Sequence, residues 1–142
     1  MAEIRFFNED IIYIIRNKAA VRKWIGKAIT KEGFRLKELN YIYCSDAHLC
    51  KMNVHYLHHH TYTDIITFNL SENKKEVAGE IYISINRVRD NATLFKVPLR
   101  DELHRVMIHG VLHLCGYKDK SPREVKRMRN KEDYYLSLRS IL

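Results

Sequence analysis

Two histidines separated by three residues carry the clearest chemical signal in this sequence. His109 and His113 lie in a stretch whose apolar residues recur at spacings of three and four, which predicts a helix. Side chains at positions i and i+4 share one helix face, so both imidazoles can reach one ion. Gly116 is placed to end this helix, and Asp119 follows with a carboxylate. The spacing therefore predicts a metal site formed by His109, His113 and Asp119.

Three protein ligands leave a fourth coordination position open, which is the arrangement of catalytic rather than structural zinc. Bound Zn²⁺ lowers the pKa of its water to about 7 and polarises a phosphoryl or carbonyl oxygen. We therefore expect one Zn²⁺ ion as the cofactor. The simpler alternative is a pair of core histidines on an amphipathic helix. The helix stop and the third ligand at motif spacing favour the metal.

The residue after the first histidine separates two kinds of enzyme. The spacing matches the long zinc motif of metalloproteases, which place a glutamate there as the general base. Gly110 occupies that position and cannot accept a proton. A metallopeptidase thus remains only an alternative. Glycine inside a helix costs about 1 kcal/mol relative to alanine, so we expect close approach of another backbone there, or space for a bulky substrate.

The elements that must position these residues are helices flanking a few strands. We expect one α+β domain over residues 1–142, with a small mixed sheet of about four strands and a zincin-like helix carrying the metal site. The expected strands cover residues 4–7, 39–44, 65–70 and 81–85. The expected helices cover residues 17–31, a segment after Ser45-Asp46, residues 86–94, a segment from Pro98 to Gly116, and a segment from Ser121 onward.

Composition narrows the possible partners. There are 25 Lys and Arg against 17 Asp and Glu, a formal net charge of +8, and this excess predicts an anionic partner, most commonly nucleic acid. No apolar run approaches the ~20 residues of a membrane span, and Ile11–Ile15 is too short for a signal-peptide core. The three cysteines show no CxxC spacing. We therefore expect a cytoplasmic protein that binds RNA and no membrane.

Several polar residues outside the histidine segment are further candidates. Asp64 begins a strand and could serve as a base or support a metal ligand, although a carboxylate there often bonds backbone amides. Tyr117 and Tyr62 are candidates for stacking on a base. Consecutive residues do not face one way, so residues 58–60, all histidine, favour an exposed loop over a second metal site. The expected RNA contacts are Arg105, Lys118, Lys120 and Arg123.

The segment from His109 to Asp119 resembles the H-G-x-L-H-L-x-G-Y-D-H signature of the YbeY family of bacterial endoribonucleases. The resemblance extends over roughly residues 35–138, in further blocks at Met52-Asn53 with Tyr56, at residues 63–68, at residues 79–84, and at Met128, Glu132 and Leu136. It implies a zinc-dependent, single-strand-selective endoribonuclease acting in 16S ribosomal RNA maturation and ribosome quality control, with the small ribosomal subunit as a partner.

Three positions depart from that pattern. Asp119 stands in place of the third metal-binding histidine, Lys118 in place of the preceding aspartate, and Leu57 in place of an arginine that could bind a phosphate. Arg105, one turn before His109, is a candidate to replace that arginine. Leu57 and the basic charge also leave open a non-enzymatic RNA-binding ribosome-assembly factor whose metal is structural.

Overall fold

The computed structural model describes residues 3–57 and 63–140, apart from the side chains of residues 56 and 57. Four strands and five helices make up this part of the chain. In order they are β1 (Glu3–Asn8), α1 (Lys18–Lys31), β2 (Arg35–Cys44), α2 (Asp46–Leu57), β3 (Ile65–Asn69), β4 (Glu76–Ser84), α3 (Ile85–Phe95), α4 (Leu99–Leu114) and α5 (Pro122–Ser137).

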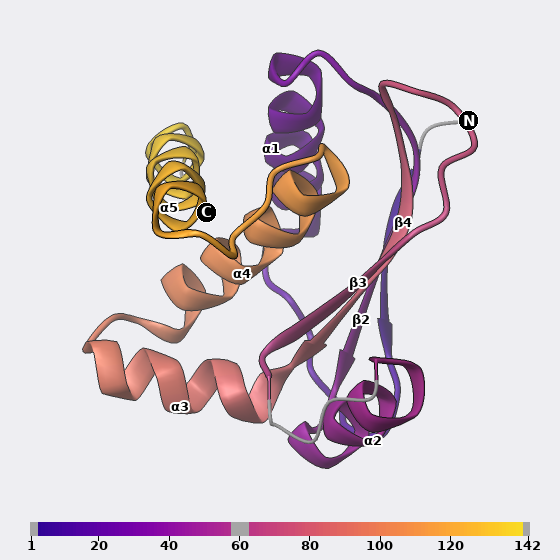
Figure 1. Ribbon diagram of the computed structural model, residues 1–142. Coiled ribbons are helices and arrows are strands. Elements are labelled where there is room, and N and C mark those ends of the chain that lie inside the picture. The colour runs from indigo at the N-terminus through magenta and orange to yellow at the C-terminus, as the bar shows by residue number, and fades with distance from the viewer. Residues whose placement is uncertain (1–2, 58–62, 141–142) are drawn as a thin grey trace.

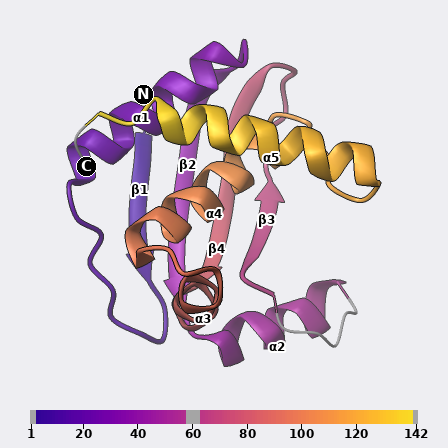
Figure 2. The same cartoon turned by 90° about the vertical axis from the view of Figure 1, so that its left-hand side faces the viewer.

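The strands form one mixed sheet in the order β1-β2-β4-β3. β1, β2 and β4 run parallel, and β3 pairs antiparallel to β4. Helices α1, α4 and α5 lie on one side of this sheet, and α4 lies between the sheet and α5 (Figures 1 and 2). The expected α+β class with a mixed sheet of about four strands is confirmed.

Helix α4 is buried on most of its surface rather than on the single apolar face that its spacing predicts. All of residues 106–112 are buried except His109, which is partly exposed. The reason is that α4 packs against α1, α3 and α5 as well as against β3 and β4. The helix that carries both histidines is therefore the centre of the core and cannot shift freely. None of the described helices combines the length and apolar character needed to cross a membrane.

The opposite face of the sheet is covered at one end by α2. Leu49 of α2 packs with Cys44 and Ile66 in a small second cluster. Ser45 begins the helix as expected, because its hydroxyl accepts a hydrogen bond from the His48 backbone N–H at 3.1 Å. This helix also contacts α3, β3 and β4, so it packs against the junction at which β4 leads into α3.

Two strands are longer than their sequence patterns indicate. β2 begins at Arg35 instead of Leu39, and β4 begins at Glu76 instead of Ile81. The added residues pair with each other in parallel register, Arg35 opposite Glu76, and an ion pair of 2.9 Å joins these two side chains. Pairing between strands thus extends both strands beyond the apolar alternation that predicts them.

Gly110 explains how α4 approaches the sheet. A Cβ atom at this position would lie 2.8 Å from Cδ1 of Ile81 and 3.0 Å from Cδ1 of Ile65. Both distances are shorter than van der Waals contact. The close approach at this glycine is therefore made by two core side chains of β4 and β3, and not by another backbone as the sequence predicts.

Substitution of this glycine tests the packing. We expect Gly110→Ala to lower the free energy of unfolding by about 1 kcal/mol, because overpacking of about 1–3 kcal/mol exceeds the gain in helix propensity. Gly26→Ala in α1 is the matched control, since a Cβ there meets nothing within 4 Å, and it should raise stability by up to about 1 kcal/mol. Urea denaturation measures both. Equal shifts for the two variants would contradict a tight contact at Gly110.

A buried histidine beside α1 predicts an acid-sensitive fold. Burial, with the positive charge of Arg139, lowers the pKa of His104 from 6.5 to about 4. The unfolded chain therefore takes up this proton at a higher pH than the folded chain. Protonation of the unfolded chain should therefore cost the wild type nothing above pH 6.5 and up to about 3 kcal/mol of stability as pH falls from 6.5 toward 4. His104→Phe lacks this group, so the urea midpoint of the wild type should fall more steeply than that of His104→Phe from pH 7 to 4, and parallel curves would contradict the lowered pKa.

Candidate metal centre

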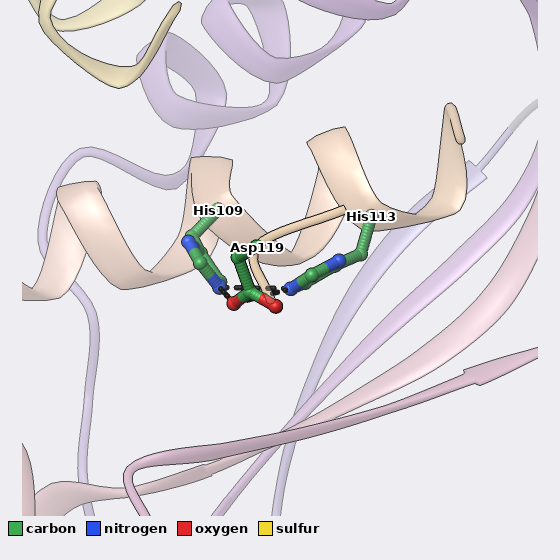
Figure 3. A group of neighbouring side chains, drawn as sticks. All are labelled: His109, His113 and Asp119. Atoms are coloured by element: carbon green, nitrogen blue, oxygen red, sulfur yellow. Dashed lines mark hydrogen bonds and ion pairs between the residues drawn. The ribbon is translucent and has the colours of Figure 1, made fainter. Parts of the chain in front are cut away.

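Two imidazoles and a carboxylate converge at the end of α4 (Figure 3). The Nε2 atoms of His109 and His113 lie 2.9 Å apart. Asp119 Oδ2 lies 3.3 Å from the first and 3.2 Å from the second. Tetrahedral coordination with bonds of 2.0–2.1 Å would separate ligand atoms by about 3.3 Å. The three atoms are thus placed closely enough to hold one metal ion.

The outer nitrogen of each ring fixes which nitrogen faces the centre. His113 Nδ1 lies 2.9 Å from the backbone carbonyl oxygen of Tyr117, which can only accept, so Nδ1 carries a proton. His109 Nδ1 donates to Glu132 Oε2 at 2.6 Å. Neutral rings then point two Nε2 lone pairs at each other beside a carboxylate. This arrangement favours a positive charge between them, which a metal cation would supply.

A proton meets the same need in the metal-free protein. Burial opposes a charge on His109, but the hydrogen bond and negative charge of Glu132 outweigh burial, and Asp119 and Asp64 act in the same direction. Together they raise the pKa of His109 above its ordinary value. The centre is therefore built to attract a cation, and a proton competes with a metal for the same nitrogen.

The turn after α4 brings Asp119 back to the helix. Gly116 adopts a φ of 99°, which favours glycine, and the Tyr117 N–H donates to the Leu112 carbonyl oxygen at 3.0 Å. Ser121 and Glu124 then form a capping box that starts α5. The turn between the two helices is consequently short and defined at both ends.

A buried carboxylate holds this turn against the rest of the molecule. Glu32, the residue after α1, accepts hydrogen bonds from the hydroxyls of Tyr117 and Tyr135 and from Lys131 Nζ. Burial raises its pKa, but these bonds prevail and lower it, so the carboxylate stays ionised. Arg127 also lies over the Tyr117 ring, 5.1 Å from its centroid. Tyr117, a candidate for base stacking, therefore anchors the segment of residues 115–121, which we call the metal loop, through its contacts with α5 and with the end of α1.

Glu132 of α5 is the residue of this centre that the sequence pattern did not assign a role. Its side chain is only 6% exposed, and its second oxygen accepts from Arg105 at 2.9 Å. Burial raises the pKa of Glu132, but the bonds to His109 and Arg105 outweigh burial and lower it. Its position four residues after Met128, within the apolar stripe of α5, is a signal for a buried charged group.

Beside the centre is a cleft of about 530 Å³ between α3, α4 and α5. It contains two of the proposed metal ligands and both charged and apolar side chains. The residues lining it are Asp64, Asn91, Phe95, Glu102, Arg105, Val106, His109, Asp119, Val125, Met128, Arg129 and Glu132. The metal centre thus opens onto a cavity of the size that binds small organic groups.

Asp64 lies in this cleft although it comes from the segment before β3. Burial raises the pKa of its carboxyl group, and the charge of His109 acts against that rise. Its backbone carbonyl accepts from the Ser84 N–H at 3.0 Å, which fixes it at the end of β4. The structure therefore brings Asp64, His109 and Asp119 to one cavity.

The expected RNA-contacting residues divide into two groups. Arg105 lines the cleft, but its guanidinium group bonds Glu132 and Asp133, at 2.9 and 2.7 Å. Lys118, Lys120 and Arg123 are exposed, and none of them is among the cleft-lining residues of the described chain. Phe95 and Arg129 do line the cleft. Arg129 belongs to the basic run of residues 118–131, in which the sequence predicts contacts with RNA phosphates, whereas no sequence signal pointed to Phe95.

The remaining candidates fall outside the described residues. They are Tyr62, His58, His59 and His60, together with the side chain of Leu57.

Comparison with known proteins finds similar sequences and a similar fold along nearly the whole chain. A family model described as Endoribonuclease YbeY matches residues 4–139. A curated relative from Cytophaga hutchinsonii, named Endoribonuclease YbeY, is 53% identical over 136 residues, covering 96% of this chain and 95% of the relative. A relative of the same name from Flavobacterium psychrophilum is 50% identical, covering 93% of this chain and 94% of the relative. The solution structure of TM1509 from Thermotoga maritima superposes with a TM-score of 0.65 at 28% identity, covering 95% of this chain and 87% of that one.

The contact between Glu132 and His109 predicts a strong effect on metal affinity. We expect Glu132→Ala to weaken binding of Zn²⁺, used as the probe ion, by about 10- to 100-fold, because His109 loses the acceptor that orients it. Glu132→Gln keeps an acceptor and should lose less. Competition with a chromogenic chelator measures these affinities.

Asp133→Ala is the matched control for this experiment. Asp133 bonds the other branch of Arg105 at 2.7 Å and is exposed, so its removal disturbs Arg105 but leaves the bond between Glu132 and His109. The affinity of the Asp133→Ala variant for Zn²⁺ should stay within about twofold of wild type. A folded Glu132→Ala protein with wild-type affinity would contradict the orienting role.

Proposed function

Because the chain belongs to the YbeY family of endoribonucleases, we propose that it is a zinc-dependent endoribonuclease that cleaves single-stranded RNA. The observation that carries this proposal is the convergence of two Nε2 atoms and a carboxylate oxygen within 3.3 Å of one another at the wall of a cleft. Metal-assisted cleavage needs such a set of ligands beside a space for substrate.

The donor set supports one Zn²⁺ ion. Two neutral imidazoles and one carboxylate are the kinds of ligand that catalytic zinc takes, and three ligands leave a position for water or substrate. In this assignment His109, His113 and Asp119 hold the ion. A zinc ion bound there would lower the pKa of a coordinated water to about 7 and polarise a phosphodiester oxygen.

We assign Asp64 as the general base, which accepts the proton of the attacking oxygen. A general base works best when its pKa approaches the working pH, and burial shifts the pKa of Asp64 upward in that direction. Asp64 also lines the same cleft as His109, so a substrate held at the metal would occupy the cavity that Asp64 faces. Glu132 keeps the imidazole of His109 in the tautomer that presents Nε2 to the centre.

Basic side chains around the centre suit an RNA backbone. Arg129 lines the cleft and is 57% exposed, so it can reach a phosphate. Lys118, Lys120 and Arg123 lie exposed on the metal loop and at the start of α5, where they extend the positive charge beyond the cleft. Arg105 contributes its charge to the cleft wall while bonded to two carboxylates.

We further propose that residues 1–142 act as one domain in the cytoplasm, in 16S ribosomal RNA maturation and ribosome quality control. The small ribosomal subunit would be the partner that presents the RNA. The support for this is the family resemblance along the chain and the net charge of +8, which favours binding to RNA.

Cleavage of a single-stranded RNA by zinc-loaded protein tests the proposal directly. We expect cleavage of single-stranded RNA, little cleavage of the same sequence in a duplex, and loss of activity on chelation. A His109→Ala, His113→Ala double variant, purified in parallel, should lose stoichiometric zinc and at least about 100-fold in rate. His55→Ala in α2, which removes an exposed histidine, should retain both.

Two other outcomes would favour the alternatives. Equal rates for the wild type and the double variant, or no cleavage by either, together with unfolding on metal removal, would indicate an assembly factor with a structural metal. Zinc-dependent cleavage of an unfolded protein instead of RNA would indicate a metallopeptidase.

A further inference from the structure

We propose that Phe95 is a stacking platform for a nucleobase of the RNA, in the same cleft as the metal centre. This inference rests on the proposed function, because it names how that site would recognise its substrate. Phe95 lines the same cleft as His109 and Asp119, and the residue is 52% exposed. An aromatic ring held half-exposed inside a cleft offers a flat apolar face to a ligand.

The two ends of the cleft differ in chemistry. Glu102, Val106 and His109 lie on one face of α4, at spacings of four and three, so the cleft follows this helix. Glu102 and His109 are seven residues apart, which corresponds to about 10 Å along the helix axis. The metal ligands lie toward the His109 end. Phe95 ends α3 shortly before α4 begins, so it belongs to the Glu102 end (Figure 1).

The platform is held in place by the end of α3. Lys96 adopts a left-handed conformation with φ 57°, and its N–H donates to carbonyl oxygens of the last helical turn. The Val97 N–H donates to the Ala92 carbonyl oxygen at 3.0 Å. These bonds form a closed C-cap around Phe95, so its exposure does not result from an unwound helix end.

The surroundings of Phe95 suit a nucleotide. Asn91 lies one turn earlier on the same helix and also lines the cleft, and its amide can both donate to and accept from the edge of a base. Val125 and Met128 of α5 add apolar surface, and Arg129 adds a charge for the adjoining phosphate. A flat ring, an amide and a guanidinium group together match the face, edge and phosphate of one nucleotide.

This platform would select for single strands. A cation bound by His109, His113 and Asp119 attracts any phosphate and does not distinguish a paired strand from an unpaired one. A base in a duplex is stacked on both faces, so it can reach Phe95 only after unpairing, whereas an unpaired base can turn onto the ring. Stacking on a protein aromatic ring is worth about 5- to 150-fold in affinity per base.

A protein-docking surface is the competing explanation for exposed apolar residues in this region. Leu94 and Val97, which flank Phe95, are 72% and 39% exposed. Neither of them lines the cleft among the described residues, whereas Phe95 does. The position of Phe95 inside a cavity with polar walls favours a nucleotide over a protein surface.

Variants of Phe95 and Leu94 test the platform with zinc-loaded full-length protein. The probe is a fluorescent single-stranded RNA, used for binding by anisotropy and for steady-state cleavage. We expect Phe95→Ala to weaken binding and to lower kcat/KM by about 5- to 150-fold, mainly through KM. Phe95→Trp should restore both values. Leu94→Ala should behave as wild type, and all variants should keep wild-type zinc affinity and urea midpoints.

A second substrate identifies the contact as one with a base. In an RNA that lacks one base next to the mapped cleavage position, wild-type binding should fall by the same factor as in Phe95→Ala. Removing that base should cost the Phe95→Ala variant nothing further, because the partner is already absent. Independent, additive losses would overturn the platform.

The remaining outcomes separate this inference from the proposed function. Wild-type binding of intact RNA by Phe95→Ala would overturn the platform even if the protein is a nuclease. Equal losses in Leu94→Ala and Phe95→Ala would also overturn it and would indicate a protein-docking face. If the wild type binds RNA without cleaving it, the proposed function fails, and the binding comparison still decides the role of Phe95.

Discussion

The hydrogen bond of 2.6 Å between His109 Nδ1 and the buried carboxylate of Glu132 is the contact on which the metal centre and the position of α5 both depend. It fixes the tautomer of one ligand and places a negative charge behind it. Glu132 is buried, so that charge must be compensated, and Arg105 and His109 supply the compensation. Loss of Arg105 or of the His109 ring would leave the buried Glu132 carboxylate with fewer partners, which is costlier than a lost surface contact.

The second imidazole is fixed by the backbone instead of by a charge. His113 donates to the Tyr117 carbonyl oxygen, and Tyr117 is in turn held by Glu32 at the end of α1. One ligand therefore depends on α5 and the other on the turn after α4. Since both supports meet around Glu32 through Tyr135 and Lys131, α1, α4 and α5 form one connected frame around the centre.

Close packing of α4 on the sheet sets where this frame sits. Gly110 lets Ile81 and Ile65 approach the helix, and Gly79 of β4 lets Leu114 approach the strand. A Cβ at residue 79 would also lie 2.6 Å from the Phe68 carbonyl oxygen. With α4 seated this closely, the side of the helix that bears His109 faces the cleft and the opposite side faces the core.

The charges of the cleft connect cation binding with anion binding. Four carboxylates line it, Asp64, Glu102, Asp119 and Glu132, against the guanidinium groups of Arg105 and Arg129. Burial raises the pKa of both Asp64 and Glu102, and the negative charge of Glu132 acts in the same direction on each. A divalent cation would balance the surplus, and a phosphate would then meet a neutral cavity instead of a repelling one.

The sequence by itself determined the helix of the two histidines, the turn at Gly116 and the return of Asp119, because these depend on local periodicity and short-range turns. It also determined the α+β class and most of the elements. Only the tertiary structure decided that Glu132 supports His109, that Phe95 and Arg129 enter the cleft, and that β2 begins at Arg35 and β4 at Glu76. Those features arise from packing of α5 and α3 on α4 and from strand pairing between segments about 40 residues apart. Such contacts produce no periodic pattern in the sequence, because the two residues that form each contact are far apart along the chain.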